Sequence, residues 1–105
     1  MGSGNSVITL SKSQQSRLRG LGQSLKPALH IGRDGHTPAT QRALEDLFEH
    51  RELVKARVLP NSAAPAREVA AAMAAEAGAA LVGVVGHTFV LYRPNPRLKE
   101  RIALE

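Results

Sequence analysis

Residues 81–92, LVGVVGHTFVLY, contain two runs that are rich in β-branched and aromatic side chains. Gly86 and His87 separate the two runs, and a two-residue connection that contains glycine is typical of a tight β-hairpin. The sequence therefore predicts antiparallel strands at 81–85 and 88–92. The other elements are predicted outward from this hairpin.

A further strand is predicted at residues 53–59. Val54 and Val58 alternate with Lys55 and Arg57, and alternation of this kind gives a strand one apolar face and one charged face. We expect the apolar face to lie on the core and the basic face to point away from it.

Two helices are predicted on either side of this strand. The alanine-rich segment 65–77 has helical spacing and is followed by Gly78, which suits the end of a helix. The other helix begins with Thr37 as the N-cap and Pro38 as the first helical residue, and it runs to about residue 50.

The first part of the chain predicts one more helix and one short strand. Ser11 and Gln14 have the spacing of a capping box, which favours a helix that starts at residue 11 and is stopped by Pro27. The apolar run at 28–31 is expected to be a short buried strand.

The predicted order is α-β-α-β-α-β-β, without an internal repeat or a linker. Helices between the early strands require crossover connections, so the four-stranded sheet should be mixed, parallel early and antiparallel at the hairpin. We predict an α/β fold: a single compact domain with helices packed on the sheet. Residues 1–9 are expected to be a disordered leader or residues added for expression, 10–96 the domain, and 97–105 a basic tail that is frayed or lightly packed.

Composition limits the class of protein. The 105 residues are 43% apolar and 22% charged, which fits one soluble globular domain. The absence of cysteine excludes disulfide scaffolds, thiolate zinc sites and cysteine nucleophiles. No segment approaches the roughly 20 apolar residues that span a bilayer, and no signal-peptide pattern is present. We expect a cytoplasmic protein without a membrane partner.

Charge points to a polyanionic partner. Fourteen Lys and Arg residues oppose nine Asp and Glu residues, which gives a net charge of +5 and an isoelectric point near 10.5. For a small basic protein, nucleic acid is the first candidate partner. The cations concentrate on the first helix, near residues 32–35, on the strand at 53–59 and at residues 93–101.

The segment Gly32-Arg33-Asp34-Gly35 joins a predicted strand to a predicted helix. Paired glycines allow backbone amides to approach a phosphodiester, and a helix N-terminus adds a partial positive charge. The GXXG loop of KH domains binds nucleic-acid backbone in this way. Such a motif alone is more often a simple turn, and it is the nearby Lys26, Arg33 and His36 that favour a phosphate contact.

Aromatic residues indicate the mode of binding. The chain has only Phe48, Phe89 and Tyr92, and both phenylalanines are expected in the core. Tyr92 is then the single candidate for stacking on a base, which is too little for a platform that binds single strands. We expect contacts mainly to the backbone of structured RNA, with an affinity that falls steeply with salt.

No catalytic or metal-binding motif is found. The four histidines are scattered, and His30 is expected to be a half-buried strand residue. No G-x-S-x-G or P-loop pattern occurs, so we expect neither an enzyme nor a cofactor. The alternative function is a protein-interaction adaptor that docks on ribosomal or assembly proteins through the acidic patch Glu45, Asp46, Glu49 and Glu52.

Four segments together resemble, in order and spacing, the YhbY family of CRM domains; they are residues 25–27, 31–37, 53–58 and 85–94. The similarity extends over about residues 10–96. It implies an RNA-binding module with a fold similar to the C-terminal domain of translation initiation factor three. Stand-alone bacterial members are associated with precursors of the large ribosomal subunit, and plant relatives function in group II intron splicing.

The resemblance also implies a site. The family's glycine loop corresponds to residues 32–35, where Asp34 introduces a negative charge and shifts weight to Arg33 and to the basic strand. Family members often have lysine in the hairpin turn, where this chain has His87. The expected partner is structured RNA, a ribosomal RNA precursor in the pre-ribosomal large subunit, bound by a monomer. The candidate RNA-binding residues are Arg17, Arg19, Lys26, Gly32, Arg33, Asp34, Gly35, His36, Lys55, Arg57, His87 and Arg93.

Overall fold

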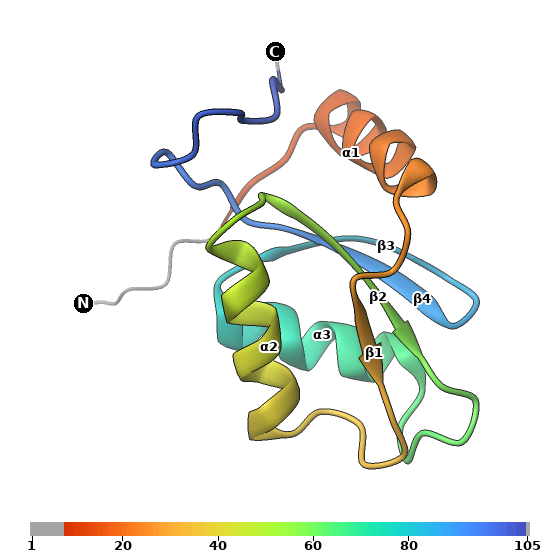
Figure 1. The fold of residues 1–105 in the computed structure, drawn as a ribbon. Helices are drawn as coiled ribbons and strands as arrows, with labels where there is room; N and C mark the ends of the chain where they lie inside the picture. The colour runs from red at the N-terminus through yellow and green to blue at the C-terminus, as the bar shows by residue number, and fades with distance from the viewer. Residues whose placement is uncertain (1–7, 105) are drawn as a thin grey trace.

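The computed structural model describes residues 8–104, so most of the predicted leader lies outside the described residues. The elements occur in the predicted order (Figure 1). They are α1 (Lys12–Ser24), β1 (Leu29–Ile31), α2 (Pro38–Phe48), β2 (Leu53–Val58), α3 (Ala66–Ala77), β3 (Ala80–Val85) and β4 (Thr88–Tyr92). None of these helices has both the length and the apolar sequence that a membrane crossing requires.

The four strands form one mixed sheet in the order β1-β2-β4-β3. β1 and β2 are parallel, while β4 is antiparallel to both β2 and β3. The predicted mixed sheet is therefore confirmed. The hairpin turns at Gly86, whose φ of 59° is the left-handed conformation that glycine adopts without strain.

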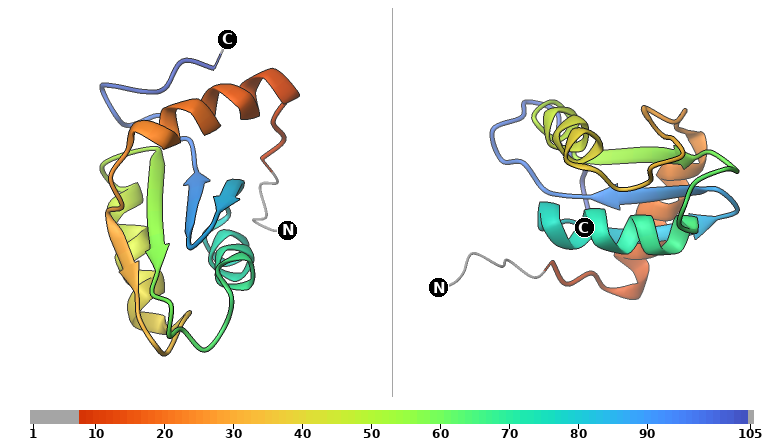
Figure 2. Two further views of the ribbon diagram at one scale, coloured as in Figure 1. Left: turned by 90° about the vertical axis from the view of Figure 1, so that its right-hand side faces the viewer. Right: turned by 90° about the horizontal axis from the view of Figure 1, so that it is seen from below.

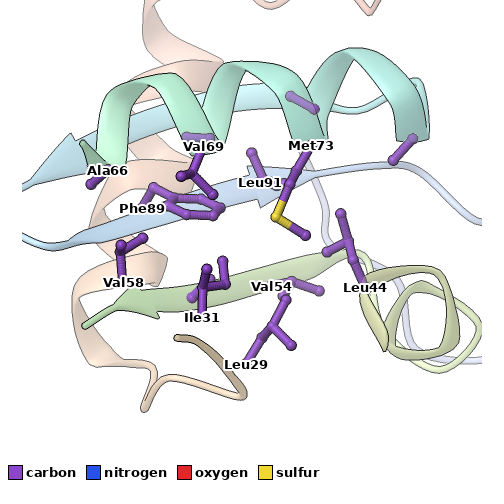
Figure 3. Close-up of a cluster of buried hydrophobic side chains, with 14 of the residues drawn as sticks. Leu29, Ile31, Leu44, Val54, Val58, Ala66, Val69, Met73, Phe89 and Leu91 are labelled. Carbon is purple, nitrogen blue, oxygen red and sulfur yellow. The ribbon is translucent and has the colours of Figure 1, made fainter. Parts of the chain in front are cut away.

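Helices cover both faces of the sheet (Figure 2). α2 packs against β1 and β2 and α3 packs against β3 and β4, while α1 packs against β2, β3 and β4. The main core lies under α2 and α3, where Phe89 and Met73 fill the centre (Figure 3). A second cluster lies under α1 and contains Leu18, Leu53, Val82, Val90 and Tyr92.

The alternation along β2 sorts its side chains as predicted. Val54, Ala56 and Val58 are buried in the main core, whereas Arg57 is exposed and Lys55 partly buried on the α1 side. Both predicted N-caps are present, with a reciprocal capping box at Ser11 and another at Thr37.

Of the two alternatives for the C-terminal segment, frayed or lightly packed, the structure has a segment that packs on the domain. The buried carboxylate of Glu52 accepts hydrogen bonds from the amide of Asn95 at 2.6 Å, the amide of Ile102 at 2.8 Å and Arg101 Nε at 2.9 Å. Ile102 and Leu104 then pack against the second cluster. Polar residues without periodicity hide this arrangement in the sequence, because one distant carboxylate holds them.

α1 approaches the sheet closely at Gly22. A Cβ built on this glycine would lie 2.9 Å from Val90 Cγ2, well inside contact distance. A Cβ built on Gly20, two residues earlier in the same helix, has no atom within 4 Å. The fold therefore requires a glycine at residue 22 but not at residue 20.

This difference gives a matched pair of variants. Gly20→Ala should stabilise the protein by about 1 kcal/mol, because alanine favours the helix. Gly22→Ala gains the same propensity but should destabilise the protein by about 1–3 kcal/mol, because Val90 must move. Urea unfolding of both variants measures the difference, and a Gly22→Ala protein as stable as Gly20→Ala would contradict the packing.

Glu52 should make stability depend on pH. Burial alone would raise the pKa of Glu52, but the hydrogen bonds from Asn95, Ile102 and Arg101 outweigh it and hold the pKa below its ordinary value of 4.5. The carboxylate thus stabilises the fold above that value, and this stability is lost as the pH falls through the lower folded pKa.

We expect Glu52→Gln to lower the free energy of unfolding at neutral pH by about 2 kcal/mol, through loss of charge-assisted hydrogen bonds. The variant should then lose less stability than the parent between about pH 7 and about pH 3.5. Denaturant unfolding at both pH values checks this. Equal losses in parent and variant would show that Glu52 does not carry the acid dependence.

Candidate nucleic-acid interface

Three connections meet at one end of the sheet (Figure 1); they are residues 32–36, 59–65 and 86–87. The amide of Ala63 donates to the carbonyl of Arg33 at 2.8 Å, which joins the first two. The amide of Val58 donates to the carbonyl of His87 at 2.7 Å, which joins β2 to the hairpin turn. Arg33 and His87 therefore lie at the same end of the domain.

The loop at 32–35 is a closed turn in which the Gly35 amide donates to the Gly32 carbonyl at 3.0 Å. Gly35 has φ 66°, so the backbone itself requires a glycine there. Gly32 has no positive φ, and a Cβ added to it would have no atom within 4 Å. Nothing within the described residues explains Gly32, and its open surroundings leave room for a ligand backbone beside the exposed Arg33.

The start of α2 has fewer free backbone amides for binding a phosphate than the sequence suggests. Thr37 and Thr40 cap each other reciprocally, so the amides of both residues already have partners. Pro38, the first helical residue, has no amide hydrogen. The helix N-terminus that we expected to contact a phosphate therefore has fewer free amides than the sequence suggests.

His36 is partly buried and has partners inside the protein. Its Nε2 lies 2.8 Å from Gln41 Oε1 and 3.2 Å from Glu76 Oε1. The buried Gln41 in turn donates to the Met73 carbonyl. This chain of contacts joins α2 to α3 behind the glycine loop.

Five cationic or titratable residues belong to the part of β1 and β2 that α1 does not cover, or to the chain beside it. We call this surface the basic face. It consists of Arg19, Lys26, His30, Lys55 and Arg57. His30 and Arg57 are paired neighbours on β1 and β2. Lys26 enters from the α1–β1 connection, where the Ala28 amide donates to the Lys55 carbonyl at 2.8 Å. Arg19 of α1 and Lys55 line the same hollow.

His30 is exposed, which corrects the expectation of a half-buried residue. Its neighbours Leu29 and Ile31 are buried in the main core, so alternation turns His30 to the opposite side. The sequence contains this signal, because Leu29, His30 and Ile31 alternate between apolar and polar side chains.

In the part of the chain that the structure describes, the members of the basic face have no acidic partner. Among residues 8–104, the ion pairs join His36 to Glu76, Arg93 to Glu45 and Arg101 to Glu52. Arg33 and the basic face take part in none of them, so their charges are available to a ligand.

Arg93 and Arg17 belong elsewhere, although the sequence placed them in the same group. Arg93 Nη1 lies 2.8 Å from Glu45 Oε1 and 2.9 Å from the Ala77 carbonyl, and its guanidinium lies 4.7 Å from the centre of the Phe48 ring. Arg17 Nε donates to the Ala103 carbonyl at 2.6 Å, on the side of α1 that faces the C-terminal segment.

The predicted acidic patch and the stacking tyrosine are also altered. Glu52 is buried and Glu45 is paired with Arg93, so two of the four carboxylates are engaged in the fold. Tyr92 is buried under α1, which together with the charge of Glu52 raises the pKa of its hydroxyl. Tyr92 therefore cannot stack on a base.

Comparison with known proteins agrees with this fold. The sequence matches the CRS1 / YhbY (CRM) domain over residues 10–93. The chain belongs to the CRM domain family. The predicted resemblance is confirmed, and the match includes the glycine loop, β2 and the hairpin.

Several bacterial proteins are similar to this CRM domain over nearly their whole length. An "RNA-binding protein" of Haemophilus influenzae is 34% identical over 89% of this chain and 94% of its own. "Probable RNA-binding protein YqeI" of Bacillus subtilis is 30% identical over 87% of this chain and 95% of its own. The solution structure of SAV1595 from Staphylococcus aureus, a hypothetical protein to which RNA binding is attributed, has a TM-score of 0.74 at 30% identity, covering 85% of this chain and 93% of that one.

The two glycines of the loop should respond differently to alanine. Gly35→Ala should destabilise the fold by about 1 kcal/mol, because alanine is strained at positive φ. Gly32→Ala should leave the melting temperature unchanged, since its Cβ meets no atom within 4 Å. Thermal unfolding measures both, and a large loss in Gly32→Ala would mean that the fold itself requires this glycine.

Proposed function

We propose that this CRM domain is a non-catalytic protein that binds structured RNA through its sugar–phosphate backbone, as a cytoplasmic monomer that assists assembly of the large ribosomal subunit. The glycine loop and the basic face form the proposed binding surface. The observation that carries the proposal is that Lys55 and Arg57 lie together on β2, at the end of the sheet where the glycine loop presents Arg33, and that within the described residues none of the three is in an ion pair, unlike Arg93 and Arg101.

Unpaired cations suit a phosphate partner for electrostatic reasons. Each Lys or Arg that neutralises a phosphate releases condensed counterions, which favours binding at low salt. Arginine adds bidentate hydrogen bonds to phosphate oxygens. With both phenylalanines and Tyr92 buried, the domain lacks the aromatic platform of single-strand binders, which supports recognition of backbone and shape.

The ribosomal part of the proposal is supported by the family. Relatives that align along almost the whole chain carry RNA binding in their names. The resemblance to YhbY proteins implies an association with large-subunit precursors. The adaptor alternative has less support, because two carboxylates of the acidic patch, Glu45 and Glu52, are already paired with arginines within the fold.

The proposal is tested by charge reversal on the surface. We expect Arg33→Glu combined with Lys55→Glu to weaken binding to a structured fragment of large-subunit ribosomal RNA by at least about tenfold at low salt. The slope of log affinity against log salt should become shallower by about two, one for each lost phosphate contact. Fluorescence anisotropy at several salt concentrations measures both quantities.

Arg97→Glu provides the matched control. Arg97 is exposed in the C-terminal segment, next to Asn95, which donates to the Phe48 carbonyl at the far end of α2 from the glycine loop. This variant makes the same change of charge at one residue, away from the proposed surface. Arg97→Glu should change the affinity for RNA little. If its loss of affinity per reversed charge equals that of the double variant, net charge explains the effect and the proposed surface is wrong.

A further inference from the structure

A hollow of about 170 Å³ lies between α1 and the β3–β4 hairpin, beside the basic face. Its walls come from both elements: Gly22 and Arg19 on α1, Gly83 and Val85 on β3, and Val90 on β4. Lys55 lies at its border on β2. The hollow thus combines an apolar lining with two unpaired cations.

The apolar part is open on the side of Gly83 and closed at Gly22. Gly22 brings α1 down onto Val90, and Gly83 leaves the floor of the hollow without a side chain. Val85 is 71% exposed, the most exposed of the large apolar side chains in the described residues. An exposed valine beside cations is an apolar surface that the fold itself does not use.

The size fits one planar ring system. An engineered apolar cavity of about 150 Å³ takes up benzene. Arg19 reaches across the hollow, with its Nε 3.5 Å from the position that a Cβ on Gly83 would take. A guanidinium plane can stack on a base where aromatic side chains are missing.

We propose that this hollow holds the base of one unpaired nucleotide of the bound RNA, beside Arg19 and against the aliphatic side chains of Val85 and Val90, with a flanking phosphate at Lys55. This inference rests on the proposed function and adds to it: the domain recognises structured RNA that carries an extruded nucleotide next to a helix. Unpaired nucleotides in structured RNA can be extruded without loss of the neighbouring duplex, and a pocket then reads them.

The test uses three RNA hairpins of the same stem: one with a single bulged nucleotide, one with an abasic residue at the bulge, and one fully paired. The parent protein should bind the bulged hairpin at least about fivefold more tightly than the abasic one, which is the lower end of what one stacked base contributes. A fluorescent 2-aminopurine at the bulge should change its emission on binding.

Gly83→Val fills the hollow without changing the charge. Valine suits a strand, and its Cβ meets only the flexible end of Arg19 at 3.5 Å, so we expect the variant to fold, which its melting curve verifies. It should bind the bulged and abasic hairpins equally, and the fully paired hairpin as the parent does. Gly20→Val, on the same helix as Arg19 but outside the lining, should keep the parent's preference.

The outcomes separate the two proposals. If the parent binds all three hairpins equally well, or if Gly83→Val keeps the preference for the bulged base, the pocket is not the site and the proposed backbone contact survives. If no hairpin binds at all, the proposed function fails and the pocket fails with it.

Discussion

The contact between Gly22 and Val90 determines how α1 lies on the sheet. Because residue 22 has no side chain, the helix packs directly on β4, and its apolar residues close over the part of the sheet that contains Leu53. Farther along the same face of the sheet, the paired residues His30 on β1 and Arg57 on β2 remain exposed to solvent. The basic face is therefore the portion of the sheet that this helix leaves uncovered, and the hollow beside it follows from the same close approach.

Two of the fourteen Lys and Arg residues are held by carboxylates inside the fold and are not free to meet a ligand. Arg93 and Arg101 are bound by Glu45 and Glu52 and contribute to the packing of the C-terminal segment and the end of α2. Lys55 and its neighbours have no such partner within the described residues. A net charge of +5 predicts a polyanionic partner, but only the positions of the carboxylates show which side of the domain meets it.

Periodic features of the sequence predicted the fold and part of the site. The two-residue turn at Gly86, the alternation along β2 and the cap at Thr37 are local signals, and each agrees with the structure. The roles of His36 and Glu52 were not predictable, because each depends on hydrogen bonds to residues that are distant in sequence and that follow no repeating pattern. Sequence reasoning thus located the basic strand and the loop but grouped with them side chains that the fold uses elsewhere.

The hydrogen bonds of Glu52 determine how long a fragment must be to fold on its own. The match to the family domain covers residues 10–93, yet the donors to this carboxylate are Asn95, Arg101 and Ile102. A fragment cut at residue 93 would lose all three of these hydrogen bonds, and with them the packing of Ile102 and Leu104 on the second cluster. Excised or fused versions of this domain should therefore keep the residues that follow the family match.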